Sequence, residues 1–167
     1  NNNNNMFNVI YAIYVASCFS YALVALCVLC DANIAFSVSG RAVFPCRPVA
    51  CALLAANSAC SLHADVLHCK ELARFPLSRY PSDRLCAFWS GADRAFAVLT
   101  ATAFSLNVFK LERRDSVFMI VSATVALWFS YQGRRARIVG NVTNYMCFHI
   151  LWHLHLPACF YLMLVGK

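Results

Sequence analysis

Charged side chains are scarce in this sequence. Asp, Glu, Lys and Arg make up 13% of its 167 residues, whereas 61% are hydrophobic. A soluble domain carries roughly 25% charged residues, so the low charge excludes a chain that is covered by water on all sides. We therefore expect lipid to replace water around much of the surface, and we predict an integral membrane protein.

Acidic residues are especially few, and they leave a formal net charge of +7. In a soluble protein this excess would suggest nucleic acid, but here the basic residues lie mostly in short segments between apolar runs, where they anchor helices at lipid headgroups. We therefore expect no nucleic-acid partner. The first apolar run has no basic region before it and is about twice as long as a signal-peptide core, so we interpret it as a retained span.

Several apolar stretches are long enough to cross a membrane as helices. At a rise of 1.5 Å per residue, about 20 residues cross roughly 30 Å of hydrocarbon. We predict an all-α fold, a polytopic transmembrane helical bundle of about five spans that forms one integral membrane domain over residues 1–167. The spans are expected at residues 6–30, 48–69, 85–109, 117–131 and 139–165, after a low-complexity leader at residues 1–5.

The apolar stretch of residues 144–164 contains three histidines. Ionisable side chains at membrane depth are costly and usually mark function. His149 and His153 are four residues apart, so on a helix they lie one turn apart on the same face and can both bind one metal ion. His155 lies about 200° around the helix from His153, which excludes it from that pair.

Two further polar residues are expected at a similar depth. Counted from the membrane surface that faces the loop of residues 70–84, His63 lies roughly 9 Å deep and Asp93 roughly 12 Å deep. On the same scale His149 and His153 lie roughly 15 and 21 Å deep. Three protein ligands plus water form the usual catalytic zinc site. The first hypothesis is therefore zinc held by the three histidines, with Asp93 holding or deprotonating the water.

Two other interpretations stay open. Haem b needs one histidine from each of two helices that face across a bundle, and His63 with His149 could supply them. Alternatively, these side chains make ordinary polar contacts, with Asp93 paired to Arg94 and the histidines bonded to backbone or headgroups. Asp65 is two residues from His63 and hence on another helix face, so we expect it to cap the helix or to pair with a loop arginine.

The order of these residues resembles the CREST superfamily of membrane hydrolases, which includes the alkaline ceramidases and the progestin and adipoQ receptors. The shared features are His63 late in the second span, Asp93 early in the third, and H-x-x-x-H in the last span, here HILWH from His149 to His153. The tryptophan in HILWH and the segment ADRAFA around Asp93 are similar to the ceramidase-type branch. Over residues 58–164, the resemblance implies a seven-helix fold in which three histidines bind zinc and the aspartate assists the zinc-bound water in cleaving a lipid amide.

The sequence departs from this family pattern in two ways. The family has a serine four residues before its first histidine, but here that position is Ala59, with Ser58 and Ser61 nearby as candidates for positioning water. About two spans follow Asp93, where the family has four. The loss of one pair of helices preserves the direction of the last helix, so the site can persist while the walls of the lipid cavity change.

These observations predict a ceramidase-like, zinc-binding membrane protein that hydrolyses an amide or ester bond of membrane lipids, if it is active. That function would place it in the endoplasmic reticulum or Golgi. The alternative is a non-catalytic structural subunit of a larger membrane complex, for example an organellar respiratory assembly in the mitochondrial inner membrane, with other membrane subunits as partners. The small size, the missing serine and the scarcity of soluble loops favour this alternative.

Overall fold

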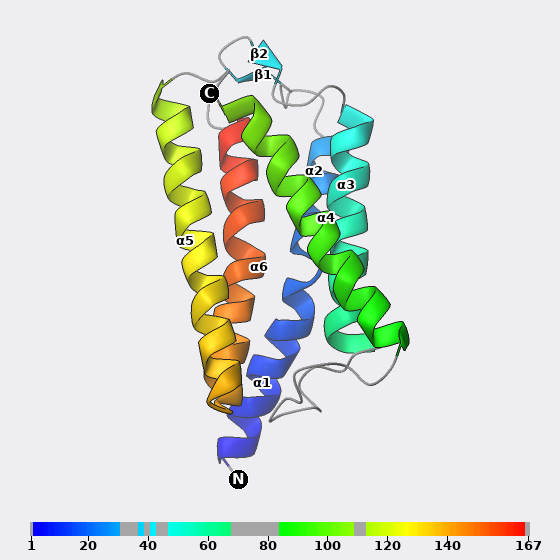
Figure 1. The fold of residues 1–167 in the computed structure, drawn as a ribbon, viewed down its shortest axis with the longest axis vertical. Helices are drawn as coiled ribbons and strands as arrows, with labels where there is room; N and C mark the ends of the chain where they lie inside the picture. Colours follow the sequence, from blue (N-terminus) through cyan, green and yellow to red (C-terminus); the bar gives the residue numbers. More distant parts are fainter. Residues whose placement is uncertain are drawn as a thin grey trace.

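The apolar stretches of the sequence form helices, as Figure 1 shows. The computed structural model describes residues 2–30, 37–38, 41–42, 47–67, 84–108 and 113–165. Its helices are α1 (Asn2–Ser17), α2 (Ser20–Cys30), α3 (Arg47–Leu62), the π-helical turn η1 (His63–Leu67), α4 (Arg84–Val108), α5 (Arg113–Ile138) and α6 (Val142–Val165). A pair of two-residue strands, β1 (Ser37–Val38) and β2 (Arg41–Ala42), joins antiparallel with Ser37 opposite Ala42. The predicted all-α class is confirmed.

The first apolar run, expected as one helix over residues 6–30, is broken. α1 ends at Ser17 and α2 begins at Ser20, with a bend of 45° between them. Serine side chains compete with the backbone for hydrogen bonds and so weaken a helix interior. The break frees backbone groups, and the Ser58 hydroxyl of α3 donates a hydrogen bond to the carbonyl of Cys18.

α6 lies at the centre of the arrangement. It runs beside α5 along its length and also packs against α1 and α2, while α3 packs against α2 and α4 (Figure 1). Buried apolar side chains form one cluster where α2, α3, α5 and α6 meet, which includes Val28, Leu54, Met119 and Phe160. A second cluster joins α1, α5 and α6 through Tyr14, Ala136, Tyr145 and Met146.

A tight turn connects α5 to α6 and determines where α6, the helix that carries His149 and His153, begins. Gly140 has a φ of 75°, which glycine adopts without the steric cost of a Cβ. The backbone N–H of Asn141 donates to the carbonyl of Ala136, closing α5 in the manner of a Schellman motif. The Asn141 side-chain oxygen then accepts a hydrogen bond from the N–H of Asn144 and caps the start of α6.

Among the described residues, two helices are long and apolar enough to cross a membrane, Pro48–Leu67 and Ser116–Ile138. The bent pair Asn5–Ser17 and Ser20–Cys30 adds a third if the two helices form one span. Large apolar side chains also point outward, including Leu127 at 65% exposure and Val98 at 63%. These features are consistent with a membrane protein.

The other helix bounds differ from the expected ones at their ends. α5 covers Arg113–Ile138, so it extends beyond the predicted residues 117–131 in both directions and takes in the arginine-rich segment at its C-terminal end. A helix can continue through polar residues where its turns face solvent or lipid headgroups. The length of the apolar run alone therefore underestimates the length of the helix. Residues 68–69 and 109 of the predicted spans lie outside the described residues.

Candidate metal centre

Asp65, His149 and His153 lie together inside the bundle. One potential ligand atom from each of these side chains lies within 4.8 Å of the ligand atoms of the other two. Among the described residues, these three are the His, Cys, Asp or Glu side chains that lie close enough together to hold a metal ion. Nε2 of His149 is 2.8 Å from Oδ2 of Asp65, and Nε2 of His153 is 3.7 Å from the same oxygen. η1 supplies the carboxylate and α6 supplies both imidazoles.

The local helix geometry explains how these three side chains meet. His149 and His153 are one turn apart on α6, and their rings stack with centroids 4.4 Å apart. At His63 the chain passes from α3 into the π-helical turn η1, which changes the angular spacing of side chains relative to an α-helix. Asp65 then faces α6, whereas the His63 ring stacks on Trp89 of α4 with centroids 4.1 Å apart.

The break between α1 and α2 packs directly against this group. The Cys18 thiol lies 3.8 Å from Oδ2 of Asp65, and the Ser20 hydroxyl donates a hydrogen bond to the backbone carbonyl of His153. The Tyr14 ring, at the end of α1, lies 4.9 Å from the His149 ring. The residues at the break between α1 and α2 therefore contact Asp65, His149 and His153 directly.

The donor set fits a divalent transition metal. Two imidazoles and one carboxylate form a known catalytic zinc set, in which the ligand atoms lie about 3.4 Å apart for tetrahedral bonds of about 2.1 Å. The two distances from Asp65, 2.8 and 3.7 Å, lie on either side of that value, and all three ligand atoms lie within 4.8 Å of one another. Nδ1 of His153, the other ring nitrogen, is buried and has no hydrogen-bond partner among the described residues.

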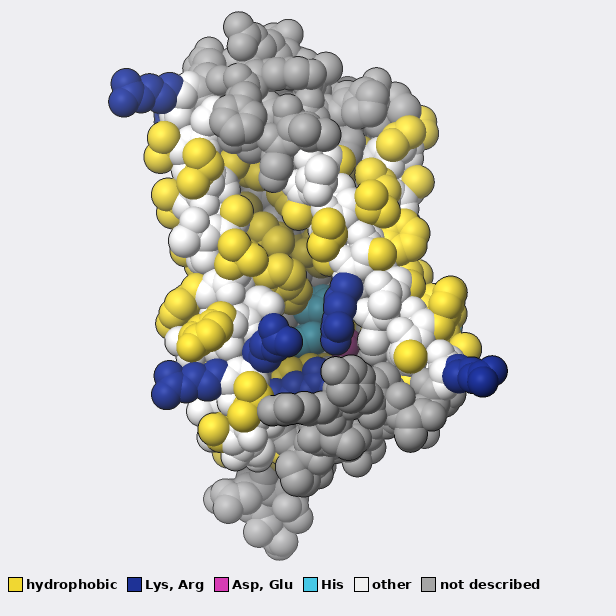
Figure 2. All heavy atoms as spheres, in the orientation of Figure 1, with side chains coloured by type: hydrophobic (Ala, Val, Ile, Leu, Met, Phe, Trp, Pro, Cys, Tyr) yellow, Lys and Arg dark blue, Asp and Glu magenta, His cyan; other side chains and the backbone are white. Residues whose placement is uncertain are grey.

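The group lies in a polar pocket of about 380 Å³. Figure 2 shows histidine side chains in a hollow of the surface, with Lys or Arg side chains on both sides. The pocket is therefore open to a small molecule that carries polar groups. The charged and imidazole side chains that line it are Asp65, Asp93, Arg94, Arg134, Arg137, His149 and His153.

Asp93, the predicted catalytic residue, lines the same pocket from α4. The Ser61 hydroxyl donates a hydrogen bond to its Oδ1 at 2.5 Å. This bond fixes the orientation of the Asp93 carboxylate. The structure thus brings Asp93 and Ser61 into the neighbourhood of the three candidate ligands.

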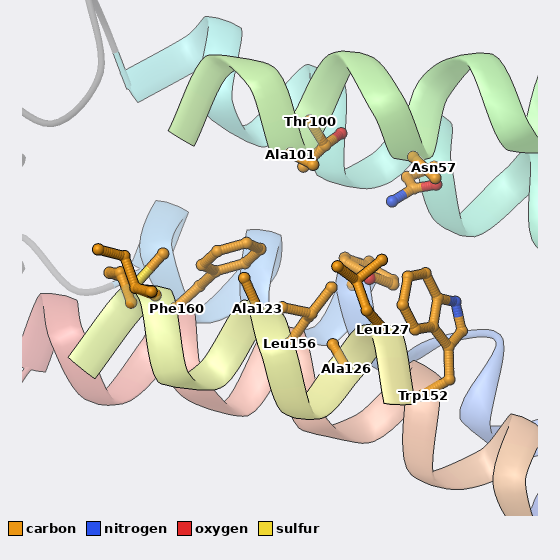
Figure 3. A pocket seen from close by; sticks show the side chains of 13 residues that line it. Asn57, Thr100, Ala101, Ala123, Ala126, Leu127, Trp152, Leu156 and Phe160 are labelled. Atoms are coloured by element: carbon orange, nitrogen blue, oxygen red, sulfur yellow. The ribbon is translucent and has the colours of Figure 1, made fainter. Parts of the chain in front are cut away.

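A second cavity, of about 390 Å³, lies beside the polar pocket and is lined mainly by apolar side chains (Figure 3). Ala97 and Trp152 line both spaces. In Figure 3, Asn57 and Thr100 lie on one side of the cavity, and α5 and α6 form the opposite side. The cavity is therefore suited to an apolar group.

The remaining predicted residues lie in different settings. His63 is outside the group of three and stacks on Trp89, and the Ser58 hydroxyl bonds the Cys18 carbonyl. Their assigned roles, and the haem b alternative that pairs His63 with His149, stay predictions.

The sequence interpretation missed Asp65 as a candidate ligand, and the structure pairs it with His149. The spacing of an ordinary α-helix gave no signal for this pairing, because it depends on the π-helical turn that begins at His63.

Comparisons of the chain with protein-family models, with curated proteins and with solved structures find no match.

Proposed function

We propose that this chain is a membrane-embedded, zinc-binding hydrolase that cleaves an amide or ester bond of a membrane lipid. The observation that carries the proposal is the group of Asp65, His149 and His153, which lies in the same pocket as Asp93. Two imidazoles and a carboxylate are typical ligands of hydrolytic zinc, and a further carboxylate beside them can move protons.

Each residue has a distinct task in this proposal. Asp65, His149 and His153 hold the metal ion, and bound zinc supplies Lewis-acid chemistry by polarising a carbonyl and activating water. Asp93 accepts a proton from the attacking water and passes it to the leaving amine or alcohol. Ser61 positions Asp93 through its hydrogen bond. The apolar cavity beside Trp152 orients the hydrocarbon part of the lipid.

The resemblance to the ceramidase-type branch supports the same activity. Ser61, Asp93 and the H-x-x-x-H pair His149 and His153 match the order of the family residues, with Asp65 where the family has its first histidine. This substitution changes a neutral ligand to an anionic one but keeps the number of protein ligands at three. The proposal therefore differs from the family pattern in the chemistry of a single ligand.

The proposed protein crosses the membrane about five times. Two described helices meet the length and hydropathy required, and the bent α1–α2 pair can form another span. α4 and α6 complete the count in this proposal, since both lie beside these helices in Figure 1. A ceramidase-like activity would place the chain in the endoplasmic reticulum or Golgi, with membrane lipids as its substrates.

Zinc content and lipid hydrolysis of purified variants test the proposed function together. We expect about one zinc per chain, lost in His149→Ala because its imidazole is a ligand. We expect Asp93→Asn to keep the zinc and to lose roughly 10²- to 10⁴-fold in hydrolysis, because an amide cannot accept the proton. The measurements are metal analysis by mass spectrometry and release of fatty acid from short-chain lipid amides and esters.

His155→Ala is the matched control, because His155 lies on the same helix and its Nε2 contacts the backbone carbonyl of Ser122, 3.1 Å away. It should keep both zinc and activity. A folded chain that binds no zinc would refute the metal centre. A zinc-loaded chain that hydrolyses no lipid and purifies only within a larger membrane complex would support the alternative of a structural subunit.

A further inference from the structure

The polar pocket has an excess of positive charge. Among the side chains that line it, three arginines oppose two aspartates, which leaves one net positive charge with the histidines neutral. A divalent metal ion at the candidate centre would raise this excess to three. Positive charge that collects in a cleft of a protein attracts anions more strongly than the same charge in open water.

The arginines approach the pocket from two helices. Arg94 belongs to α4, whereas Arg134 and Arg137 belong to α5 and are three residues apart, which places them on neighbouring positions of one face. Figure 2 shows basic side chains on both sides of the hollow that contains the histidines. A group bound between the helices can therefore contact guanidinium groups from opposite directions.

The chemistry of the guanidinium group indicates what this pocket binds. Its planar set of N–H donors matches the oxygens of carboxylate or phosphate, with two parallel hydrogen bonds to one anion. A neutral headgroup of hydroxyl and amide groups offers these arginines no negative charge. The arginines therefore favour a substrate with an anionic oxygen-bearing group close to the bond that is cleaved.

We propose that the substrate is an anionic amphiphile, with one hydrocarbon chain in the apolar cavity and a carboxylate or phosphate held by Arg94, Arg134 and Arg137. The two spaces share Ala97 and Trp152, so a single molecule can occupy both. This inference rests on the proposed function, because it assigns the substrate class of the same pocket.

Binding of two matched amphiphiles tests the inference. N-lauroylglycine and N-lauroylethanolamine have the same acyl chain and the same amide, but only the first carries a carboxylate. We expect the purified chain in phosphatidylcholine nanodiscs to bind N-lauroylglycine more tightly. The double variant R94Q/R134Q should reduce this preference about fivefold, since each exposed guanidinium contributes modestly to pairing with an anion. Dodecyl phosphate should behave like N-lauroylglycine.

The control is R114Q/R135Q, which removes the same total charge from two exposed arginines that do not line the pocket. It should leave the preference unchanged. Equal binding of the two amphiphiles, or an equal loss of preference in both double variants, would overturn the inference. Inorganic phosphate that displaces N-lauroylglycine at comparable concentration would also overturn it, because the pocket would then serve a free anion.

Measuring the affinity for N-lauroylglycine relative to N-lauroylethanolamine with and without zinc separates this inference from the proposed function. Failure to bind zinc refutes the metal centre, yet the preference for the anionic amphiphile can still be read from the metal-free chain. Zinc binding with hydrolysis of N-lauroylethanolamine and no preference for N-lauroylglycine upholds the hydrolase and refutes the anionic substrate.

Discussion

Asp65 makes the contacts on which the candidate metal centre depends. Its Oδ2 atom faces the imidazoles of His149 and His153 and the thiol of Cys18. A buried carboxylate is stable only when other groups compensate its charge, and these neighbours come from two other parts of the fold. The position of Asp65 is therefore sensitive to changes in η1, in α6 and in the break between α1 and α2.

Replacement of single residues distinguishes the two possible sets of ligands. Asp65→Ala should abolish zinc binding, because the carboxylate supplies one of three ligand atoms. His63→Ala should keep about one zinc per chain, because the His63 ring stacks on Trp89 outside that group. Metal analysis after dialysis measures both.

Asp65→His offers a control for the loss of charge, since an imidazole can also bind zinc. It should retain more zinc than Asp65→Ala. The opposite result, in which His63→Ala loses zinc and Asp65→Ala keeps it, would restore the ligand set of His63, His149 and His153.

At the scale of elements, the break between α1 and α2 links two helices to the metal centre. Ser58 of α3 donates to the Cys18 carbonyl within the break, and Ser20 donates to the His153 carbonyl just beyond it. Each bond satisfies a backbone oxygen that would otherwise be costly to bury. Ser58 therefore replaces a hydrogen bond that the break removes, whereas Ser20 bonds a carbonyl of α6 whose usual helical donor is missing because residue 157 is proline.

Removal of one of these bonds should destabilise the fold measurably. Ser58→Ala leaves the buried Cys18 carbonyl without its serine donor, so we expect the free energy of unfolding to fall by about 1 kcal/mol. Thr124→Ala is the control, because its hydroxyl bonds a carbonyl within its own exposed turn of α5 and should change stability by less than about 0.5 kcal/mol. Unfolding in denaturant, followed by circular dichroism, compares the two. Equal stabilities would show that the bond does not support the break.

The helices could be predicted from the sequence because long apolar runs need the internal hydrogen bonds of a helix in lipid. The break at Cys18 could not, because two serines in an apolar run do not by themselves end a helix and the serine that bonds the Cys18 carbonyl comes from another helix. In the site, the spacing of His149 and His153 was sufficient to place both on one face. The sequence was not sufficient to choose between His63 and Asp65 as the third candidate ligand, because that choice depends on the π-helical turn that begins at His63.

At the scale of the whole molecule, the ends of the described chain lie apart. α1 begins at one end of the bundle and α6 ends at the other (Figure 1). An odd number of membrane crossings also places the two ends of a chain on opposite sides. The five spans stay a prediction, because two described helices, or three spans with the bent pair, are long and apolar enough to cross a membrane.

Tags at the two ends test the number of crossings. In sealed membrane vesicles, a protease added outside should remove one tag and leave the other until detergent opens the vesicles. A central tag between α3 and α4 serves as the control for the orientation of the vesicles. Removal of both end tags from intact vesicles of uniform orientation would exclude an odd number of spans.

One helix, α6, forms part of both the metal centre and the apolar cavity. It carries His149 and His153, and the next turns of the same helix place Leu156 and Phe160 in the wall of the cavity. A rotation of α6 about its axis that widened the cavity would also change the distances between the imidazoles and Asp65. In the proposed hydrolase, the width of the bound hydrocarbon chain would therefore affect the geometry of the metal ligands.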